Sequence, residues 1–307
     1  MRIAHFSGSA RSIVQLRRGG ALNMELQLLD NRSQTLGEAI SSALAESEDS
    51  RMAVAFVSAQ GLGLLEPALQ QCLKRKGSVE FLVGLDLSFT DPQALRTLYQ
   101  WSRDYAHVAC YCLTELGPSV VYHPKLYVFR AGEEVRFIVG SSNLTEGGLR
   151  QNMEVNALVR AHASEEIVSD LCAVYNALKF HPKRVEPDEE FVSLYEELFS
   201  MRKRERHRAT RKAHLRRVTS RFREKVSTLR RPVPTPKDLD GWQRLVFMKL
   251  PEERFKTRDL YQFEEEFRSH YPQNQNIRAK VRQVLQQLRD LGLVKHVEWE
   301  TWEKHRA

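Results

Sequence analysis

Three apolar segments between residues 120 and 159 are separated by short polar turns, and this pattern restricts the chain here to neighbouring antiparallel strands. The segments cover residues 120–129, 135–139 and 153–159, and a Gly-Ser-Ser-Asn turn at 140–143 follows the second. Side chains of a strand alternate between its two faces, so His123 and Lys125 are expected on one face of the first strand. A hairpin then brings Ser141 and Asn143 to that face, and the third strand adds Glu154.

These five side chains are chemically suited to phosphate. The set contains the imidazole of His123, while Lys125, Asn143 and Ser141 supply donors for phosphate oxygens. Glu154 supplies a carboxylate that can orient the imidazole. The set requires no pair of metal-binding carboxylates, so the sequence predicts a phosphodiesterase site without a metal or another cofactor.

Each residue taken alone has a structural interpretation. A single histidine in an apolar strand is more often a core residue than a catalyst, and a Gly-Ser-Ser-Asn stretch is usually only a turn. Glu154 alone would most often be a solvated strand residue. Their occurrence in order on three adjacent predicted strands favours the catalytic interpretation.

The cluster resembles the phospholipase D superfamily, whose signature is His-x-Lys followed by a Gly-Ser-x-Asn element. The resemblance covers about residues 20–180. Arg130 stands where that family often has Asp, so the acidic partner must come from elsewhere, and Glu154 is the candidate. This departure is similar to the branch of metal-independent nucleases that includes a restriction endonuclease, and it favours DNA over lipid as substrate.

The resemblance also implies a mechanism and an assembly. His123 would attack phosphorus and form a phosphohistidine that water resolves, with Glu154 fixing the tautomer of the ring. Sites of this superfamily pair two such His-x-Lys sets, and this chain has one His-x-Lys that is followed by a Gly-Ser-x-Asn element. The second histidine would therefore be His123 of another copy, which makes the expected enzyme a homodimer with its active site at the interface.

Composition bounds the remaining possibilities. With 307 residues, 42% of them hydrophobic, and a mean hydropathy of −0.47, the chain has room for two globular domains. No apolar run approaches the roughly 20 residues that cross a bilayer. The first residues lack a signal-peptide core, so we expect a cytoplasmic protein without a membrane partner. The four cysteines lack CxxC spacing and are expected to be reduced and buried.

Positive charge is concentrated in residues 201–231. This segment holds fourteen Lys and Arg against two Glu, so it carries +12 and the rest of the chain carries −4 of the total +8. Such a block suits a polyanion, although a solvated helix face or a disordered tail has the same composition. Beside a phosphodiesterase site we favour contact with the DNA backbone, with Arg211, Lys212 and Arg216 as candidates.

The first half alternates strands (52–58, 79–85, 108–113) with helices (62–76, 91–105), and Asp91-Pro92 is a typical helix start. This alternation predicts an α/β domain with a mixed sheet, closed by a helix at 165–178. We expect three parts: a nuclease domain at 1–182, a basic helical connector with a Pro-rich hinge at 183–236, and a small module at 237–307.

The C-terminal module reads as a winged helix. Helices are expected at 241–250 and from Thr257, and a third carries an apolar stripe from Ile277 to Leu291 that Gly292 ends, before a wing at 293–302. Donors able to reach phosphates and base edges are expected at the start and on the outward face of the third helix, namely Asn276, Arg278, Lys280, Arg282, Gln283 and Gln286. Trp299 and Trp302 could stack on a base or pack on this helix.

Residues 240–300 also resemble the C-terminal winged helix of Dam-replacing type restriction endonucleases, through Asn274-x-x-Ile-Arg278-x-Lys280 and the following Leu288-Arg-Asp-Leu-Gly292. The resemblance implies binding of double-stranded DNA with sequence reading, and raises adenine methylation as a feature to be read. We therefore expect a restriction-type DNA endonuclease. A phospholipase or other phosphodiesterase, and a non-catalytic DNA-binding regulator, are the alternatives.

Overall fold

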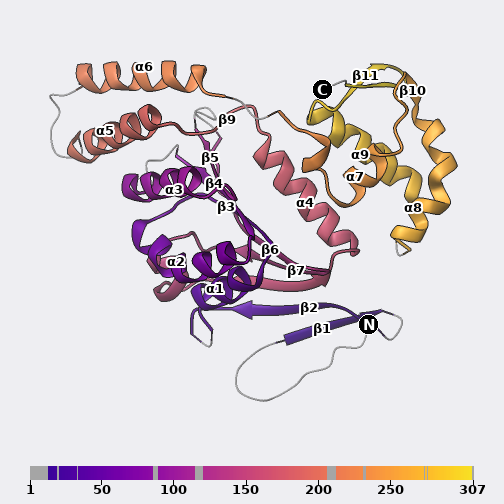
Figure 1. Ribbon diagram of the computed structural model, residues 1–307, viewed down its shortest axis with the longest axis horizontal. Coiled ribbons are helices and arrows are strands. Elements are labelled where there is room, and N and C mark those ends of the chain that lie inside the picture. The colour runs from indigo at the N-terminus through magenta and orange to yellow at the C-terminus, as the bar shows by residue number, and fades with distance from the viewer. Residues whose placement is uncertain are drawn as a thin grey trace. The chain divides into compact units, whose positions relative to one another are not determined.

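The computed structural model describes residues 13–18, 21–32, 34–85, 89–114, 120–205, 212–230, 233–272, 274 and 276–305, with backbone alone for 13–18, 21–23, 203–205 and 212–215. The chain forms two compact units (Figure 1). Unit 1 comprises Met1–Arg160 and Pro182–Arg231, and unit 2 comprises Ala161–His181 and Pro232–Ala307. Each unit therefore contains two separate stretches of sequence.

Unit 1 is built on a mixed sheet that has nine strands within the described residues. Its order is β1-β2-β8-β7-β6-β3-β4-β5-β9. The strands are β1 (Ile13–Arg18), β2 (Ala21–Leu29), β3 (Asp49–Val54), β4 (Ser78–Gly84), β5 (Val108–Leu113), β6 (Lys125–Ala131), β7 (Glu134–Gly140), β8 (Asn156–His162) and β9 (Arg184–Val185). Strands β3, β4 and β5 are parallel, whereas β6 runs antiparallel to both β3 and β7.

Helices connect the parallel strands, as expected for an α/β domain. They are α2 (Ala59–Lys74) and α3 (Pro92–Asp104), while α1 (Leu36–Glu46) precedes the first of these strands. Their starts follow from local chemistry: Thr35 and Glu38 form a capping box on α1, and Asp91 caps α3 with Pro92 at the first position. No helix in the described parts of the chain is both long and apolar enough to cross a membrane.

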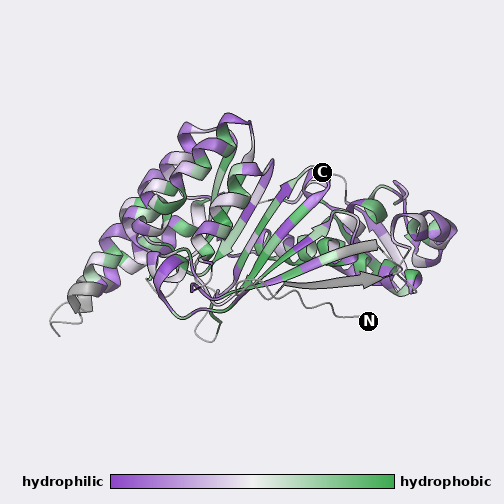
Figure 2. Ribbon diagram, turned by 90° about the horizontal axis from the view of Figure 1, so that it is seen from below, coloured by the Kyte–Doolittle hydropathy of each residue, from purple (hydrophilic) through white to green (hydrophobic). Residues whose placement is uncertain are grey.

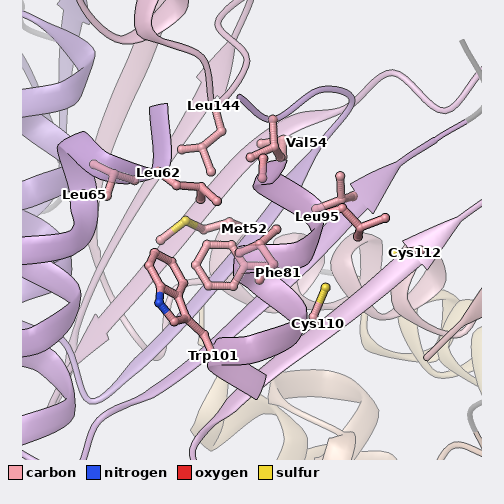
Figure 3. Close-up of a cluster of buried hydrophobic side chains, with 14 of the residues drawn as sticks. Met52, Val54, Leu62, Leu65, Phe81, Leu95, Trp101, Cys110, Cys112 and Leu144 are labelled. Atoms are coloured by element: carbon pink, nitrogen blue, oxygen red, sulfur yellow. The ribbon is translucent and has the colours of Figure 1, made fainter. Parts of the chain in front are cut away.

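The core of unit 1 lies between these helices and one face of the sheet (Figure 3). Alternate strand residues such as Met52 and Val54 point into it, together with Phe81, Cys110 and Cys112. Figure 2 shows how hydrophobic residues dominate the strands of the sheet. All four cysteines are free and buried, as the sequence predicted.

The basic segment is helical, but it forms two helices rather than one long connector. These are α5 (Glu189–Glu205) and α6 (Lys212–Thr228), which lie side by side (Figure 1). The rings of Phe191 and Phe222 are 5.0 Å apart, and both residues belong to the core of unit 1. Because apolar residues recur every three or four positions beneath the arginines of α6, this helix has a face to bury and packs into unit 1.

Unit 2 has the helix order of a winged helix. Its elements are α7 (Gly241–Phe247), β10 (Phe255–Lys256), the 3-10 helix η3 (Thr257–Phe263), α8 (Glu264–His270), α9 (Ile277–Asp290), β11 (Val294–Glu298) and β12 (Thr301–Lys304), after a short 3-10 helix, η2 (Pro236–Asp238). The predicted second helix is thus a 3-10 turn followed by α8. Gly292 follows α9 with a φ of 74°, as expected for the residue that ends it.

Helix α4 (Glu166–Lys179) is also part of unit 2. The Ser169 hydroxyl accepts a hydrogen bond from the backbone N–H of Trp242, and Asn176 donates to the side chain of Gln243. The sequence suggested instead that this helix closes the N-terminal domain. The three-part division at residues 182 and 236 stays a prediction, and the compact units divide the chain at different places.

Candidate functional site

His123 and Lys125 lie together at the start of β6. Lys125 is the first residue of the strand, while His123 precedes it, so the prediction that both belong to the strand is wrong for His123. The Nζ atom of Lys125 is 2.5 Å from Nδ1 and 3.1 Å from Nε2 of His123. The imidazole is exposed, whereas Lys125 is 7% exposed.

The electrostatics of this pair favour a neutral imidazole. Partial burial and the neighbouring Lys125 charge lower the pKa of His123. Burial lowers the pKa of Lys125, and the Glu154 carboxylate acts in the opposite direction. The shift of the His123 pKa favours the neutral ring, which has a free lone pair for attack beside the Lys125 amine.

Asn143 is positioned by Phe56, which lies just after β3, the neighbour of β6 in the sheet. Its Oδ1 accepts a hydrogen bond of 3.2 Å from the backbone N–H of Phe56, which leaves its NH2 group to donate elsewhere. The Phe56 ring meets the His123 ring edge to face at 5.5 Å. Phe56 thus holds both the amide and the imidazole, and sequence reasoning missed it because its signal is a single aromatic residue after a strand.

Ser141 and Glu154 contact each other directly. The Ser141 hydroxyl donates to Oε2 of Glu154, and Asn152 donates to Oε1 at 3.3 Å. Ser141 Oγ also accepts from the backbone N–H of Val155 at 3.1 Å. Glu154 itself precedes β8 rather than lying in it, because a π-helical turn, η1 (Gly147–Gln151), intervenes after β7.

The partners of Glu154 differ from the prediction. In the single chain this carboxylate accepts hydrogen bonds from Ser141 and Asn152, and these occupy one oxygen each. The expected contact with the His123 ring is not among its bonds. Its electrostatic effect falls on Lys125, whose pKa it raises against the effect of burial.

Asn156 supports the turn that carries Ser141 and Asn143. This residue is 1% exposed, its Oδ1 accepts from the Ser142 N–H at 3.2 Å, and its Nδ2 donates to Ser142 Oγ at 2.9 Å. A Cβ on Gly140 would lie 2.3 Å from Asn156 Oδ1, so glycine is required there. The sequence signal for Asn156 was an amide residue at the start of an apolar strand.

Several exposed apolar residues are close in sequence to the residues of the site. Val120 and Val121 precede His123, Val139 precedes Gly140, and Met153 and Val155 flank Glu154; Met153 is 88% exposed. Phe89, also exposed, meets Phe56 edge to face at 4.9 Å. Large exposed apolar side chains in one region are typical of an interaction surface.

Helix α6 carries a basic face. Its buried side consists of Val218, Phe222, Val226 and, just beyond the helix, Leu229, while Arg216, Arg217 and Arg221 are exposed. Lys225 instead binds Asp188 and Glu190 at 2.8 Å each. Arg211 lies outside the described residues, and for Lys212, the first residue of α6, only the backbone is described.

The outward face of α9 presents most of the predicted donors. Asn276, Arg278, Arg282, Gln283 and Gln286 are exposed. Arg278 binds Glu264 at 2.8 Å, and its guanidinium lies 5.0 Å from the ring centre of Tyr261. Arg282 donates to the Tyr261 hydroxyl at 3.2 Å. Tyr261 therefore aligns both arginines along α9.

Lys280 does not belong to this face, so its predicted position is wrong. It is 8% exposed, and its Nζ lies 2.6 Å from Asp170 and 3.3 Å from Glu166 of α4. Position 280 is three residues after Ile277 and four before Val284, which places it on the buried stripe of the helix. On the wing, Trp302 is buried and donates to Thr257, whereas Trp299 is 87% exposed.

Comparison with protein families gives two matches. Residues 40–178 match the profile described as "Cardiolipin synthase, PLD-like domain", and residues 242–304 match the Dam-replacing HTH domain. The first stretch contains every residue of the His123 site, and the second contains α9 and the wing. A comparison with curated protein sequences found no relative.

Solved structures of three bacterial proteins are similar to this chain. They are Nuc of Salmonella typhimurium, a phospholipase D family member (18% identity, TM-score 0.35, 45% of this chain and 84% of that chain), NucT from Helicobacter pylori (13%, 0.39, 50% and 95%), and the phosphatidylserine synthase of Haemophilus influenzae Rd KW20 (11%, 0.44, 59% and 45%). From the family matches, we conclude that the chain combines a phospholipase D-like α/β domain with a DNA-binding winged helix of the Dam-replacing type.

Proposed function

We propose that this protein is a restriction-type DNA endonuclease. The observation that carries the proposal is the convergence of the His123–Lys125 pair and the Ser141–Glu154 pair in a chain that also contains a DNA-binding winged helix. Phospholipase D-like proteins hydrolyse phosphodiester bonds. The DNA-binding domain in the same chain supports DNA as the substrate of this protein.

In the proposed reaction, neutral His123 attacks phosphorus. A P–N bond forms as the P–O bond to the leaving group breaks, and a second histidine gives the leaving oxygen its proton. Lys125, Ser141 and Asn143 hold the non-bridging oxygens while negative charge grows on them. Water then attacks phosphorus and frees the imidazole. Both steps need a positive charge beside the phosphate, and Lys125 supplies it. We therefore propose that no metal participates.

The second histidine is proposed to be His123 of another copy, in a two-fold dimer. This chain has one His-x-Lys motif that is followed by a Gly-Ser-x-Asn element, because the second His-x-Lys triplet, at His181 and Lys183, has no such element after it. The exposed residues Val120, Val121, Met153 and Val155, close in sequence to His123 and Glu154, support an interface there. Two copies joined at this surface would place two imidazoles in one site.

The arginines of α6 are proposed to contact the DNA backbone, since exposed guanidinium groups on one helix face bind phosphates without regard to sequence. The exposed donors of α9 are proposed to reach base edges in the major groove, and adenine methylation is proposed as a feature that they read there. Lys280, buried against α4, is not included in this set.

The test is digestion of plasmid DNA in excess EDTA. Adenine-methylated and unmethylated plasmids are incubated with the wild type and with His123→Ala, and the ends are sequenced. We expect defined cuts by the wild type and none by His123→Ala, which should still bind DNA. Cuts at random positions would contradict sequence recognition by the winged helix. Cleavage only after magnesium is added would contradict the metal-free mechanism.

The second candidate substrate is a phospholipid, because the profile that matches residues 40–178 is described as a cardiolipin synthase. Vesicles of phosphatidylglycerol or cardiolipin form the second arm of the experiment. Turnover of these lipids without DNA cleavage would replace the proposed function. Specific DNA binding with neither activity would favour a non-catalytic regulator.

A further inference from the structure

The loop that joins the two halves of the active site is held by a residue far away in the sequence. We define this catalytic loop as residues 144–155, from the end of the Asn143 turn to the start of β8. It contains η1 and places Glu154 beside Ser141. Leu149 at its centre is fully buried in the core of unit 1. Leu144, at the start of the loop, is buried in the same core, so apolar side chains hold the loop at its start and centre and polar contacts hold the remainder.

Asn31 supplies polar anchors within η1 and directly after it. Its Nδ2 donates to the carbonyl of Gly148 at 3.0 Å and to the carbonyl of Asn152 at 3.2 Å. Its Oδ1 accepts from the Leu36 N–H at 2.9 Å, at the start of α1. Both hydrogens of the amide are therefore used on the catalytic loop, while the oxygen holds Asn31 to the helix.

The backbone of Asn31 is adapted to this role. Its φ is 60°, in the left-handed region that side chains other than glycine and asparagine rarely adopt. Such backbone conformations persist where the surrounding structure fixes them, and they are frequent at functional sites. Here, the amide of Asn31 meets the loop while its backbone has this conformation.

The anchor leads to the carboxylate in two steps. Asn31 holds the carbonyl of Asn152, whose side chain donates to Glu154 at 3.3 Å, and Glu154 in turn accepts from Ser141. Asn152 is fixed a second time by its N–H, which donates to the Gly147 carbonyl at 2.8 Å. An unbroken series of hydrogen bonds therefore runs from Asn31 to Ser141.

Helix α1 is shaped to let the loop approach. A Cβ on Gly37 would lie 3.3 Å from the Leu149 carbonyl oxygen, which is tighter than ordinary van der Waals contact. The absence of a side chain at this position lets the first turn of α1 lie against η1. The contact between Asn31 and the loop is thus part of a fitted interface between α1 and the catalytic loop.

We propose that Asn31 is a positioning residue of the active site, which sets the orientation of Glu154 through Asn152. This inference rests on the proposed nuclease function. If Asn31 is lost, Glu154 should move away from Ser141 and Lys125, while the binding surfaces for DNA stay unchanged. The rate of the chemical step should then fall without a change in affinity.

Two substitutions distinguish the role of the Asn31 side-chain amide from that of its left-handed backbone. Asn31→Asp retains the oxygen that accepts from Leu36 but places a second oxygen against the two loop carbonyls. Asn31→Gly retains the left-handed backbone and removes the amide. Thr35→Ala is the matched control, because it breaks the capping box of the same helix and makes no hydrogen bond to the loop.

The readouts are kcat, KM and the pH profile of kcat on a duplex substrate. For Asn31→Asp we expect kcat to fall by about 100-fold at constant KM, as for a displaced catalytic group. The alkaline limit should move to lower pH, since Glu154 no longer supports the charge of Lys125. Asn31→Gly should show the same changes to a smaller degree, and Thr35→Ala should show neither.

Hydrogen exchange of residues 147–155 gives a readout that needs no activity. Asn31→Asp should speed exchange of the Asn152 amide, and Thr35→Ala should leave it unchanged. Wild-type exchange in Asn31→Asp, wild-type kcat, or an equal loss of kcat in Thr35→Ala would each overturn the proposal. If the wild-type protein cuts no DNA, the nuclease function fails, and the exchange result still decides whether Asn31 fixes the loop.

Discussion

The Nζ atom of Lys125 lies 2.5 Å from Nδ1 of His123, so the ammonium charge of one side chain acts directly on the ring of the other. Only Pro124 separates them along the chain, yet the two groups differ in exposure, because the histidine precedes the strand and the lysine begins it. The pair therefore keeps its nucleophile accessible and its cation largely buried.

This relationship predicts the pH dependence of cleavage. The reaction needs neutral His123, so the rate should rise as the pH passes through the pKa of this ring, below its ordinary value of about 6.5. The rate should fall as Lys125 loses its proton, below its ordinary pKa of about 10.4. Single-turnover rates across pH measure both limits. Lys125→Arg should remove the alkaline limit from the accessible range; an unchanged limit would assign it to another group.

Asn143→Asp should separate transition-state stabilisation from folding. The aspartate keeps an oxygen for the Phe56 N–H but replaces the NH2 donor by a second oxygen. Removal of one such donor typically lowers kcat by about 100- to 1000-fold, and a negative charge near phosphate adds to this loss. A thermal melt serves as the control. Wild-type kcat in a folded variant would show that Asn143 does not face the phosphate.

Glu154→Gln should slow cleavage because it removes a charge that supports Lys125. The amide can still accept from Ser141, so the local structure should be retained. The alkaline limit of the rate should shift to lower pH, since Glu154 raises the pKa of Lys125. Rate profiles of the two proteins test this directly. If the alkaline limits coincide, Glu154 has a role other than this electrostatic one.

The two basic surfaces should differ in their effect on specificity. Loss of Arg282 or Gln283 should weaken binding to the specific site by about 1–3 kcal/mol per lost base contact, with little change on random DNA. Loss of Arg216, Arg217 and Arg221 should lower affinity for every sequence and flatten its salt dependence. Competition binding at two salt concentrations distinguishes them. Lost specificity in the α6 variant alone would reverse the two assignments.

The Lys280 cluster should control stability rather than recognition. The double change Glu166→Ala and Asp170→Ala leaves the buried Lys280 amine without these partners, which should cost about 1–3 kcal/mol. Lys280→Met keeps the packing and removes the charge, so it should cost much less. Chemical unfolding measures both values. If Lys280→Met folded normally but lost DNA specificity, Lys280 would have to be counted among the DNA contacts.

Local patterns predicted much of the fold. The start of α3 at Asp91-Pro92, the strand β5 and the end of α9 at Gly292 follow from short-range rules for caps and alternation, and the structure has each of them. The membership of Ser141, Asn143 and Glu154 in one region also followed from strand order. These features depend on residues close together in the sequence.

Long-range contacts account for what the sequence left open. The bonds of Asn31 to the catalytic loop join positions more than a hundred residues apart, and so do those of Lys280 to α4. Nothing near Asn31 distinguishes it from a solvated polar side chain. Lys280 lies on the apolar stripe of α9, but nothing near it in the sequence indicates the carboxylates that α4 supplies. The path of the loop through a π-helical turn also removed Glu154 from the predicted strand, because alternation cannot reveal a turn between β7 and β8.

The two-segment construction of unit 2 has a consequence for synthesis on the ribosome. Helix α4 emerges first, but Lys280 follows Asp170 by 110 residues, a delay of roughly 5–20 s at ordinary rates of translation. During that interval α5 and α6 are made and can pack into unit 1. The winged helix therefore completes last, and residues 237–307 transplanted alone onto another protein would carry a lysine that has lost the carboxylates it was built against.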